Sequence, residues 1–123
     1  MEKQGAMREG KETKVMGLFS RLAGKSIDSY VTDARANGAT LVDVRQPSEF
    51  ADEHIEGAIN IPLSEIDRAP GKLKDKDATL YVYCLSGGRS GRACSQLKAM
   101  GYTDVTNIGG IGMFSGPVVS GRK

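Results

Sequence analysis

The stretch Cys84-Leu-Ser-Gly-Gly-Arg-Ser90 constrains this chain more than any other, because it joins a predicted strand to a predicted helix. The preceding residues, Thr79-Leu-Tyr-Val-Tyr-Cys84, are β-branched, aromatic and apolar, which is typical of a buried strand. The following residues, Ser90 to Met100, are rich in helix formers and end at a glycine. Two glycines between them permit the torsion angles of a tight loop.

Cys84 is predicted to lie at the floor of this loop, where backbone N–H groups and a helix N-terminus favour an anion. Such surroundings lower the pKa of a thiol and produce a nucleophilic thiolate. We therefore expect Cys84 to be the catalytic residue, while a buried structural thiol is the alternative. The residues expected to form the active-site loop and bind substrate are Leu85, Ser86, Gly87, Gly88, Arg89 and Ser90.

The length of the loop limits the anion that it can hold. Cysteine phosphatases place five residues between the cysteine and the arginine, whereas only four separate Cys84 from Arg89. The smaller ring suits one sulfur atom better than a tetrahedral oxyanion. The N–H groups of the loop, the Arg89 charge and two serine hydroxyls would stabilise a persulfide, whose charge lies on its outer sulfur.

Short strands alternate with helical segments along the rest of the chain, which predicts a mostly parallel α/β sheet covered on both faces. Ligands of such sheets bind at the carboxyl ends of the strands, where Cys84, Asp43 and Arg45 all lie. We expect strands at 40–44, 58–61, 79–84 and 104–108. We expect a helix from Ile27, with Ser26 as its cap, to the Asn37-Gly38 pair, and further helices at 48–53, 65–68 and 90–100. We also expect a solvated connection at 71–77, a tight turn at Gly109-Gly110 and a frayed end from residue 116.

The domain organisation follows from composition. Residues 1–14 are polar and without periodicity, which indicates a disordered tail or an expression remnant. Residues 15–25 place apolar side chains on one helical face, which predicts a short amphipathic helix that covers the core or docks to a partner. Residues 26–119 form the expected domain, because 123 residues with 39% hydrophobic content fit one compact unit.

Charge and cysteine content exclude several classes of function. Residues 1–25 carry six basic and three acidic side chains, so the remaining chain has a net charge of −1 and no nucleic-acid footprint. Two cysteines and one histidine without metal-ligand spacing argue against a metal site. No apolar run is long enough to span a bilayer, and no signal peptide is apparent, so we expect a cytoplasmic protein.

Several motifs in order make the chain resemble the rhodanese-like sulfurtransferase family over residues 26 to about 119. They are Leu41-Val-Asp-Val-Arg45, Glu49-Phe50, His54-Ile-Glu-Gly-Ala-Ile-Asn-Ile-Pro62, Tyr81-Val-Tyr-Cys-Leu-Ser-Gly-Gly-Arg-Ser90, Leu97 to Tyr102 and Asn107-Ile-Gly-Gly-Ile111. The resemblance implies a central five-stranded parallel sheet flanked by helices. Phe114 departs from the tryptophan that the family often carries there.

The resemblance also implies that Cys84 forms a persulfide and passes its sulfur on, without a metal or organic cofactor. The expected donor is a small sulfur-containing anion, such as thiosulfate, or a persulfide, and the expected acceptor is cyanide, a thiol or a protein thiol. Family members that prefer thiosulfate often have basic residues where this chain has Leu85 and Ser86, so thiosulfate is expected to be a poor donor. The alternatives are a non-catalytic binding module and a persulfide carrier for a protein acceptor.

Five further residues have two interpretations each. Arg89 either contributes its positive charge to the loop or pairs with a surface acid. Arg45 either lines the mouth of the pocket and attracts an anionic donor or forms an ion pair with Glu49 or a neighbouring carboxylate. Asp43 is expected to form a hydrogen bond near the loop, as an accessory or structural residue. His54 is interpreted as structural rather than functional. Cys94 is expected to pack in the core, the alternative being a resolving cysteine for Cys84.

Overall fold

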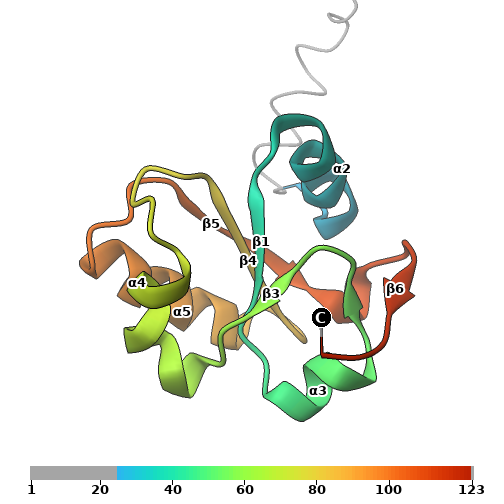
Figure 1. The fold of residues 1–123 in the computed structure, drawn as a ribbon. Helices are drawn as coiled ribbons and strands as arrows, with labels where there is room; N and C mark the ends of the chain where they lie inside the picture. The colour runs from blue at the N-terminus through green and yellow to red at the C-terminus, as the bar shows by residue number, and fades with distance from the viewer. Residues whose placement is uncertain (1–24, 123) are drawn as a thin grey trace, which may run out of the picture.

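Four parallel strands form the central sheet of the computed structural model, which describes residues 25–122 (Figure 1). In spatial order they are β3 (Ile59–Asn60), β1 (Thr40–Asp43), β4 (Leu80–Cys84) and β5 (Val105–Gly110). The predicted α/β architecture is confirmed, but the expected count of five strands is wrong for the described residues. The other two strands there are only two residues long, and they pair with each other instead of extending this sheet.

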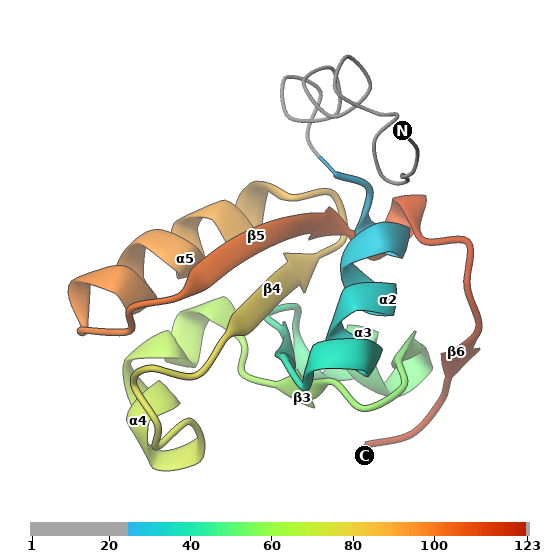
Figure 2. The same cartoon turned by 90° about the horizontal axis from the view of Figure 1, so that it is seen from above.

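Helices cover both faces of the sheet, with α2 (Ile27–Asn37) on one side and α5 (Gly88–Ala99) on the other (Figures 1 and 2). Ser26 caps α2 as predicted, because its hydroxyl oxygen accepts a hydrogen bond from the Ser29 N–H at 3.1 Å. The remaining helical segments are short. They are α3 (Pro47–Asp52), the 3₁₀ turn η1 (Leu63–Arg68), α4 (Ala69–Lys72) and the 3₁₀ turn η2 (Ile111–Met113).

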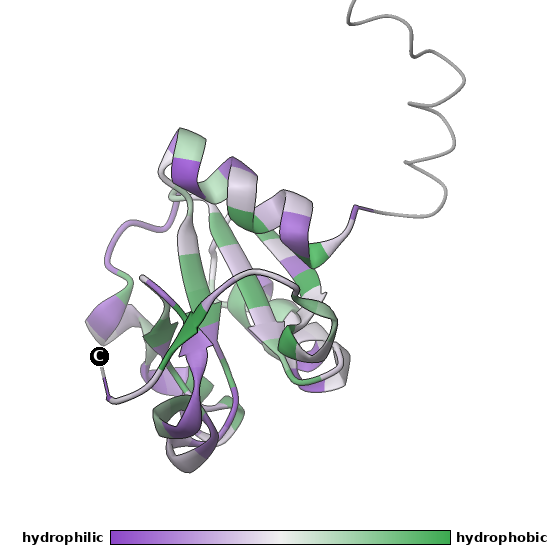
Figure 3. Ribbon diagram, turned by 90° about the vertical axis from the view of Figure 1, so that its right-hand side faces the viewer, coloured by the Kyte–Doolittle hydropathy of each residue, from purple (hydrophilic) through white to green (hydrophobic). Residues whose placement is uncertain are grey.

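Alternate residues of β4 face two different layers of the core. Leu80, Val82 and Cys84 belong to the apolar cluster that includes the buried face of α5. Tyr81 and Tyr83 face the cluster that includes the buried face of α2. This alternation is what a strand buried on both sides requires, and Figure 3 shows hydrophobic residues along the strands of the sheet. Cys84 consequently points toward the layer of α5, the helix that begins four residues later.

The C-terminal segment pairs with another strand, so the predicted fraying is wrong for residues 118–121. β6 (Val118–Val119) pairs antiparallel with β2 (His54–Ile55) at the side of the molecule (Figure 2). Beyond this strand, the Gly121 N–H donates a hydrogen bond to the Ala51 carbonyl at 2.8 Å. Val118 and Val119 thus supply the pairing strand for β2, which is not part of the central sheet.

Two other segments differ from their predicted form. Gly109 and Gly110 end β5 rather than forming a tight turn, because they pair with Tyr83 and Cys84 of β4. The connection at 71–77 is not wholly solvated, since Leu73 is buried in the core. The predicted tail at 1–14 and most of the predicted helix at 15–25 lie outside the described residues, and the domain boundary at residue 26 stays a prediction.

Candidate active site

Cys84 is the last residue of β4, and its side chain is 1% exposed. The loop residues Leu85 and Ser86 that follow it are exposed, and α5 begins at Gly88. In a parallel sheet, the loops that follow the strands gather at one edge. The thiol therefore lies beneath a short surface loop at the edge where ligands of such sheets bind.

Two hydrogen-bond donors contact the Cys84 sulfur. The Gly87 N–H donates over 3.0 Å from nitrogen to sulfur, and the Ser90 hydroxyl oxygen lies 3.4 Å from the sulfur and shares its single proton with Asn107 Oδ1, which is closer at 2.7 Å. Burial raises the pKa of the Cys84 thiol, but the Ser90 hydroxyl and the N–H groups of Ser90, Gly87 and Ser86 together lower it more. The pKa of this thiol is thus below its ordinary value, which favours the nucleophilic thiolate.

Two glycines give the loop this conformation. Gly87 has a φ of 106°, a left-handed conformation that places its N–H toward the sulfur and that other residues rarely adopt. Gly110 lies directly against the loop: a Cβ atom at this position would lie 2.0 Å from the Leu85 carbonyl oxygen. Only glycine therefore allows β5 to approach the loop so closely.

Asn107, on β5, holds the loop from the opposite side. Its side-chain oxygen accepts a hydrogen bond from the Ser90 hydroxyl at 2.7 Å, and its amide donates to the Gly87 carbonyl at 3.1 Å. The same oxygen accepts from the Gly109 N–H at 3.0 Å. Asn107 thereby connects both residues that donate to the Cys84 sulfur.

Arg89, in the first turn of α5, forms a two-point ion pair with Glu49 of α3. Its Nη1 and Nη2 atoms lie 2.7 Å and 3.1 Å from the two carboxylate oxygens. The hydrogen bonds from Arg89 lower the pKa of Glu49 to about 2, and the pKa of Arg89 is raised by the same contact and, to a lesser degree, by Cys84. These side chains are 34% and 31% exposed, so the loop presents a largely compensated charge to solvent.

The predicted accessory residues Asp43 and Arg45 pair with each other. The Arg45 Nη2 atom lies 2.7 Å from Asp43 Oδ2, and it also donates to the Glu53 carbonyl at 2.7 Å. Arg45 is 4% exposed and Asp43 is fully buried, so neither lines the mouth of the loop. Burial lowers the pKa of Arg45, but Asp43 raises it more. This pair stabilises the end of β1, and the carboxylate partner of Arg45 is Asp43 rather than Glu49.

The remaining candidates are buried. His54 is fully buried, its Nδ1 atom lies 2.8 Å from the Phe50 carbonyl oxygen, and its ring stacks on that of Phe50 at 3.7 Å. These contacts agree with the structural interpretation. Cys94 lies on the buried face of α5, and burial raises the pKa of its thiol to about 11.

The family model of the rhodanese-like domain matches residues 27–114 of this chain. The chain belongs to the rhodanese-like domain family. One curated relative is the thiosulfate sulfurtransferase PspE of Escherichia coli, which is 46% identical over 81 residues, or 65% of this chain and 78% of PspE. Another is the putative sulfur carrier protein YrkF of Bacillus subtilis, 35% identical over 68 residues, or 55% of this chain and 36% of YrkF.

This rhodanese-like chain has the same fold as solved rhodanese structures. A structure described as a rhodanese with anions from E. coli is 44% identical and superposes with a TM-score of 0.63. The match covers 68% of this chain and 99% of that one. Within residues 25–122, no helix is long and apolar enough to cross a membrane, and no group of three or more His, Cys, Asp or Glu side chains is placed to hold a metal ion.

Sequence reasoning missed three residues of this rhodanese-like site. Asn107 and Gly110 belong to a motif that carried the resemblance, but no role was predicted for either of them. Glu49 was considered as a partner for Arg45, four residues away, whereas its partner is Arg89, 40 residues along the chain. The signal for Gly110 was present, since a glycine pair at the end of a strand often marks close backbone approach.

Proposed function

We propose that this protein is a sulfurtransferase in which Cys84 carries a sulfane sulfur as a persulfide. Membership in the rhodanese-like family and relatives named for sulfur transfer support this chemistry in general. The observation that carries the proposal is the contact of the Gly87 N–H and the Ser90 hydroxyl with the Cys84 sulfur. These donors favour a negative charge on sulfur, which both the free thiolate and the persulfide need.

In the first step, the Cys84 thiolate attacks the outer sulfur of a donor such as thiosulfate or a persulfide. The S–S bond of the donor breaks, sulfite or a thiolate leaves with the electron pair, and the Cys84 persulfide forms. In the second step, cyanide or the thiolate of a small molecule or a protein attacks the outer sulfur. The S–S bond to Cys84 breaks, its thiolate is regenerated, and the acceptor leaves as thiocyanate or as a persulfide.

The loop has a separate task, which is to stabilise the anion. We assign this task to the residues from Leu85 to Ser90 and mainly to their N–H groups, since each hydrogen bond to an anion is worth about 1.5–3 kcal/mol. Arg89 contributes less than a free guanidinium would, because Glu49 engages it at two points. Leu85 and Ser86 add no positive charge, so we expect thiosulfate to be a poorer donor than a persulfide.

A persulfide carrier for a protein acceptor is the second candidate, and an apolar surface beside the loop favours it. Leu85 is 49% exposed and Met113 is 82% exposed. The Gly112 N–H donates to the Leu85 carbonyl at 3.1 Å, which places η2 against the loop. Exposed apolar side chains next to a reactive sulfur suit the surface of a protein better than a small hydrophilic acceptor.

Mass spectrometry after incubation with a sulfur donor tests the persulfide directly. We expect the wild-type protein to gain the mass of one sulfur atom, and Cys84→Ser to gain none. Cys94→Ser is the matched control, because it removes the other buried thiol and should still be loaded. Equal loading of the wild-type protein and Cys84→Ser would reject the proposal.

Acceptor kinetics separate the enzyme from the carrier. A free-standing enzyme turns over with cyanide or glutathione alone, whereas a carrier transfers its sulfur rapidly only to its protein partner. A non-catalytic binding module would instead show an unperturbed Cys84 pKa near 8.5 and no persulfide.

Both cysteines are free thiols, which suits a reducing compartment, and we propose a cytoplasmic location that cell fractionation can test.

A further inference from the structure

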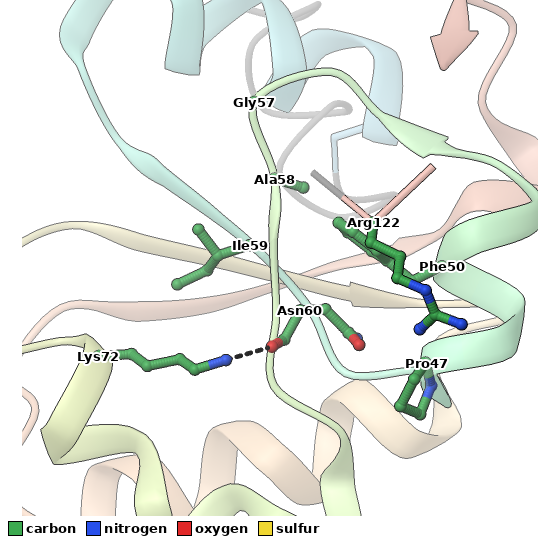
Figure 4. A pocket seen from close by; sticks show the side chains of 8 residues that line it. All are labelled: Pro47, Phe50, Gly57, Ala58, Ile59, Asn60, Lys72 and Arg122. Carbon is green, nitrogen blue, oxygen red and sulfur yellow. Dashed lines mark hydrogen bonds between the residues drawn. The ribbon is translucent and has the colours of Figure 1, made fainter. Parts of the chain in front are cut away.

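A hollow lies beside β3, an edge strand of the sheet (Figure 4). Its volume is about 660 Å³, which is within the range of sites for small organic ligands. Pro47 and Ile59 contribute apolar surface to its lining, and Phe50 and Ala58, which are 3% and 6% exposed, lie beneath it. The hollow therefore offers an apolar surface to a small ligand.

Both ionisable side chains that line this hollow are basic. Lys72, at the end of α4, and Arg122, near the C-terminus, lie on two different sides of it (Figure 4). The Lys72 ammonium donates to the Asn60 carbonyl at 3.2 Å, an interaction that leaves its charge uncompensated. Arg122 forms no hydrogen bond or ion pair with any described residue. No acidic side chain lines the hollow.

Asn60 contributes a fixed part of the lining, on which both basic side chains border. Its side-chain amide donates to the carbonyl oxygens of Asp43 at 2.9 Å and Arg45 at 3.0 Å, which fixes it against β1. The Asn60 side chain is therefore fixed, whereas the long side chains of Lys72 and Arg122 can change rotamer. Long basic side chains at a rim over an apolar floor can close on an anion while the floor contacts its hydrocarbon.

We propose that this hollow binds a small organic anion with an apolar body, whose acidic group is held by Lys72 and Arg122. The site is separate from the Cys84 loop, because none of its lining residues belongs to that loop. Its nearest connection to the loop is α3, where Pro47 and Phe50 line the hollow and Glu49 pairs with Arg89. The proposal does not depend on the sulfur-transfer proposal.

Fluorescence titration with 8-anilinonaphthalene-1-sulfonate tests this site, because that probe joins an aromatic body to a single sulfonate. Lys72→Gln and Arg122→Gln should each weaken its binding by about fivefold, the value of one exposed ion pair. Both side chains are on the surface, so neither change is expected to affect folding. Lys74→Gln is the matched control, since it removes the same charge from an exposed position two residues away that does not line the hollow.

Two further measurements locate the probe. The neutral analogue N-phenyl-1-naphthylamine should bind all of these proteins with equal affinity, because it lacks the acidic group. Cys84→Ser should bind the sulfonate as the wild-type protein does, which would place the probe away from the loop. The proposal is overturned if Lys72→Gln and Arg122→Gln bind the sulfonate like Lys74→Gln, or if Cys84→Ser abolishes its binding.

Discussion

The two cysteines of this protein occupy equally dry surroundings, yet their thiols differ in acidity. Cys84 is 1% exposed and Cys94 is 5% exposed, and both belong to the same apolar cluster. The pKa of Cys84 is below its ordinary value, whereas burial raises the pKa of Cys94 to about 11. Burial alone therefore does not decide which thiol is reactive.

The difference lies in the backbone around each sulfur. Cys84 stands where the chain leaves a strand, and N–H groups that serve no strand or helix turn toward its sulfur. Cys94 lies inside α5, where backbone N–H groups donate to carbonyl oxygens four residues earlier. Among the described residues, no hydrogen bond reaches the Cys94 sulfur. The pKa of Cys84 is lowered by the hydrogen-bond donors that the loop leaves available, and Cys94 has no such donors within residues 25–122.

The strongest test of this comparison is to push the loop away from Cys84. In Gly110→Ala, the new Cβ would lie 2.0 Å from the Leu85 carbonyl oxygen, so the loop must shift. We expect a loss of about 3 kcal/mol in the free energy of unfolding, the upper end of what overpacking costs. Sulfur loading of Cys84 should fall with it, measured by denaturant unfolding and mass spectrometry.

Gly88→Ala is the control for that change, because a Cβ atom at Gly88 meets nothing within 4 Å. Gly88 is also the first residue of α5, where alanine is acceptable. If both variants were loaded with sulfur as well as the wild-type protein is, the close approach of β5 to the loop would not be required for loading.

Alkaline stability should report the environment of Cys94. Its pKa is near 8.5 in the unfolded chain and about 11 in the folded protein, so between these values only the folded state keeps the proton. Stability therefore falls as pH rises, by about 1.4 kcal/mol per unit and about 2 kcal/mol between pH 8.5 and 10. Cys94→Ala should lose less stability over this interval in urea titrations. Parallel curves for the two proteins would show that Cys94 has an ordinary pKa.

Ser90→Ala should raise the pKa of Cys84 and so bring it closer to the pKa of Cys94. The change removes the hydroxyl that lies 3.4 Å from the Cys84 sulfur and 2.7 Å from Asn107 Oδ1. One such hydrogen bond is worth about 1 kcal/mol, so the pKa of Cys84 should rise by somewhat less than one unit. The rate of iodoacetamide alkylation as a function of pH measures this shift. Ser95→Ala, on the exposed side of α5, should leave the alkylation profile unchanged.

Removal of the ion pair between Arg89 and Glu49 should have the smallest effect of these changes on the free energy of unfolding. The pKa of Glu49 is lowered to about 2, so its contribution is present above pH 4.5 and is lost as pH falls toward 2. Because both side chains are about one third exposed, Glu49→Gln should cost less than about 1 kcal/mol near neutral pH. Urea unfolding at pH 7 and pH 3 should show this difference at pH 7 and a smaller one at pH 3. A larger difference at pH 3 would contradict the assigned pair.

The local parts of the fold were predictable because their signals lie within one segment. The Ser26 cap, the strand that ends at Cys84 and the helix after the glycines all follow from neighbouring residues. The helix begins two residues earlier than predicted, at Gly88, because Gly87 already takes the capping position. A fifth strand in the central sheet was expected from the resemblance alone, and within the described residues that sheet has four strands.

The sequence by itself determined the order of strand, glycine loop and helix, and with it the position of the one cysteine that can receive backbone donors. Only the tertiary structure decided that Glu49 would pair with Arg89, that Asn107 would tie the loop to β5, and that residues 118–119 would pair with β2. Torsion preferences and capping act between neighbours and are readable along the chain. Contacts between distant segments depend on how the strands align in the sheet, and that alignment is settled only when the whole core packs.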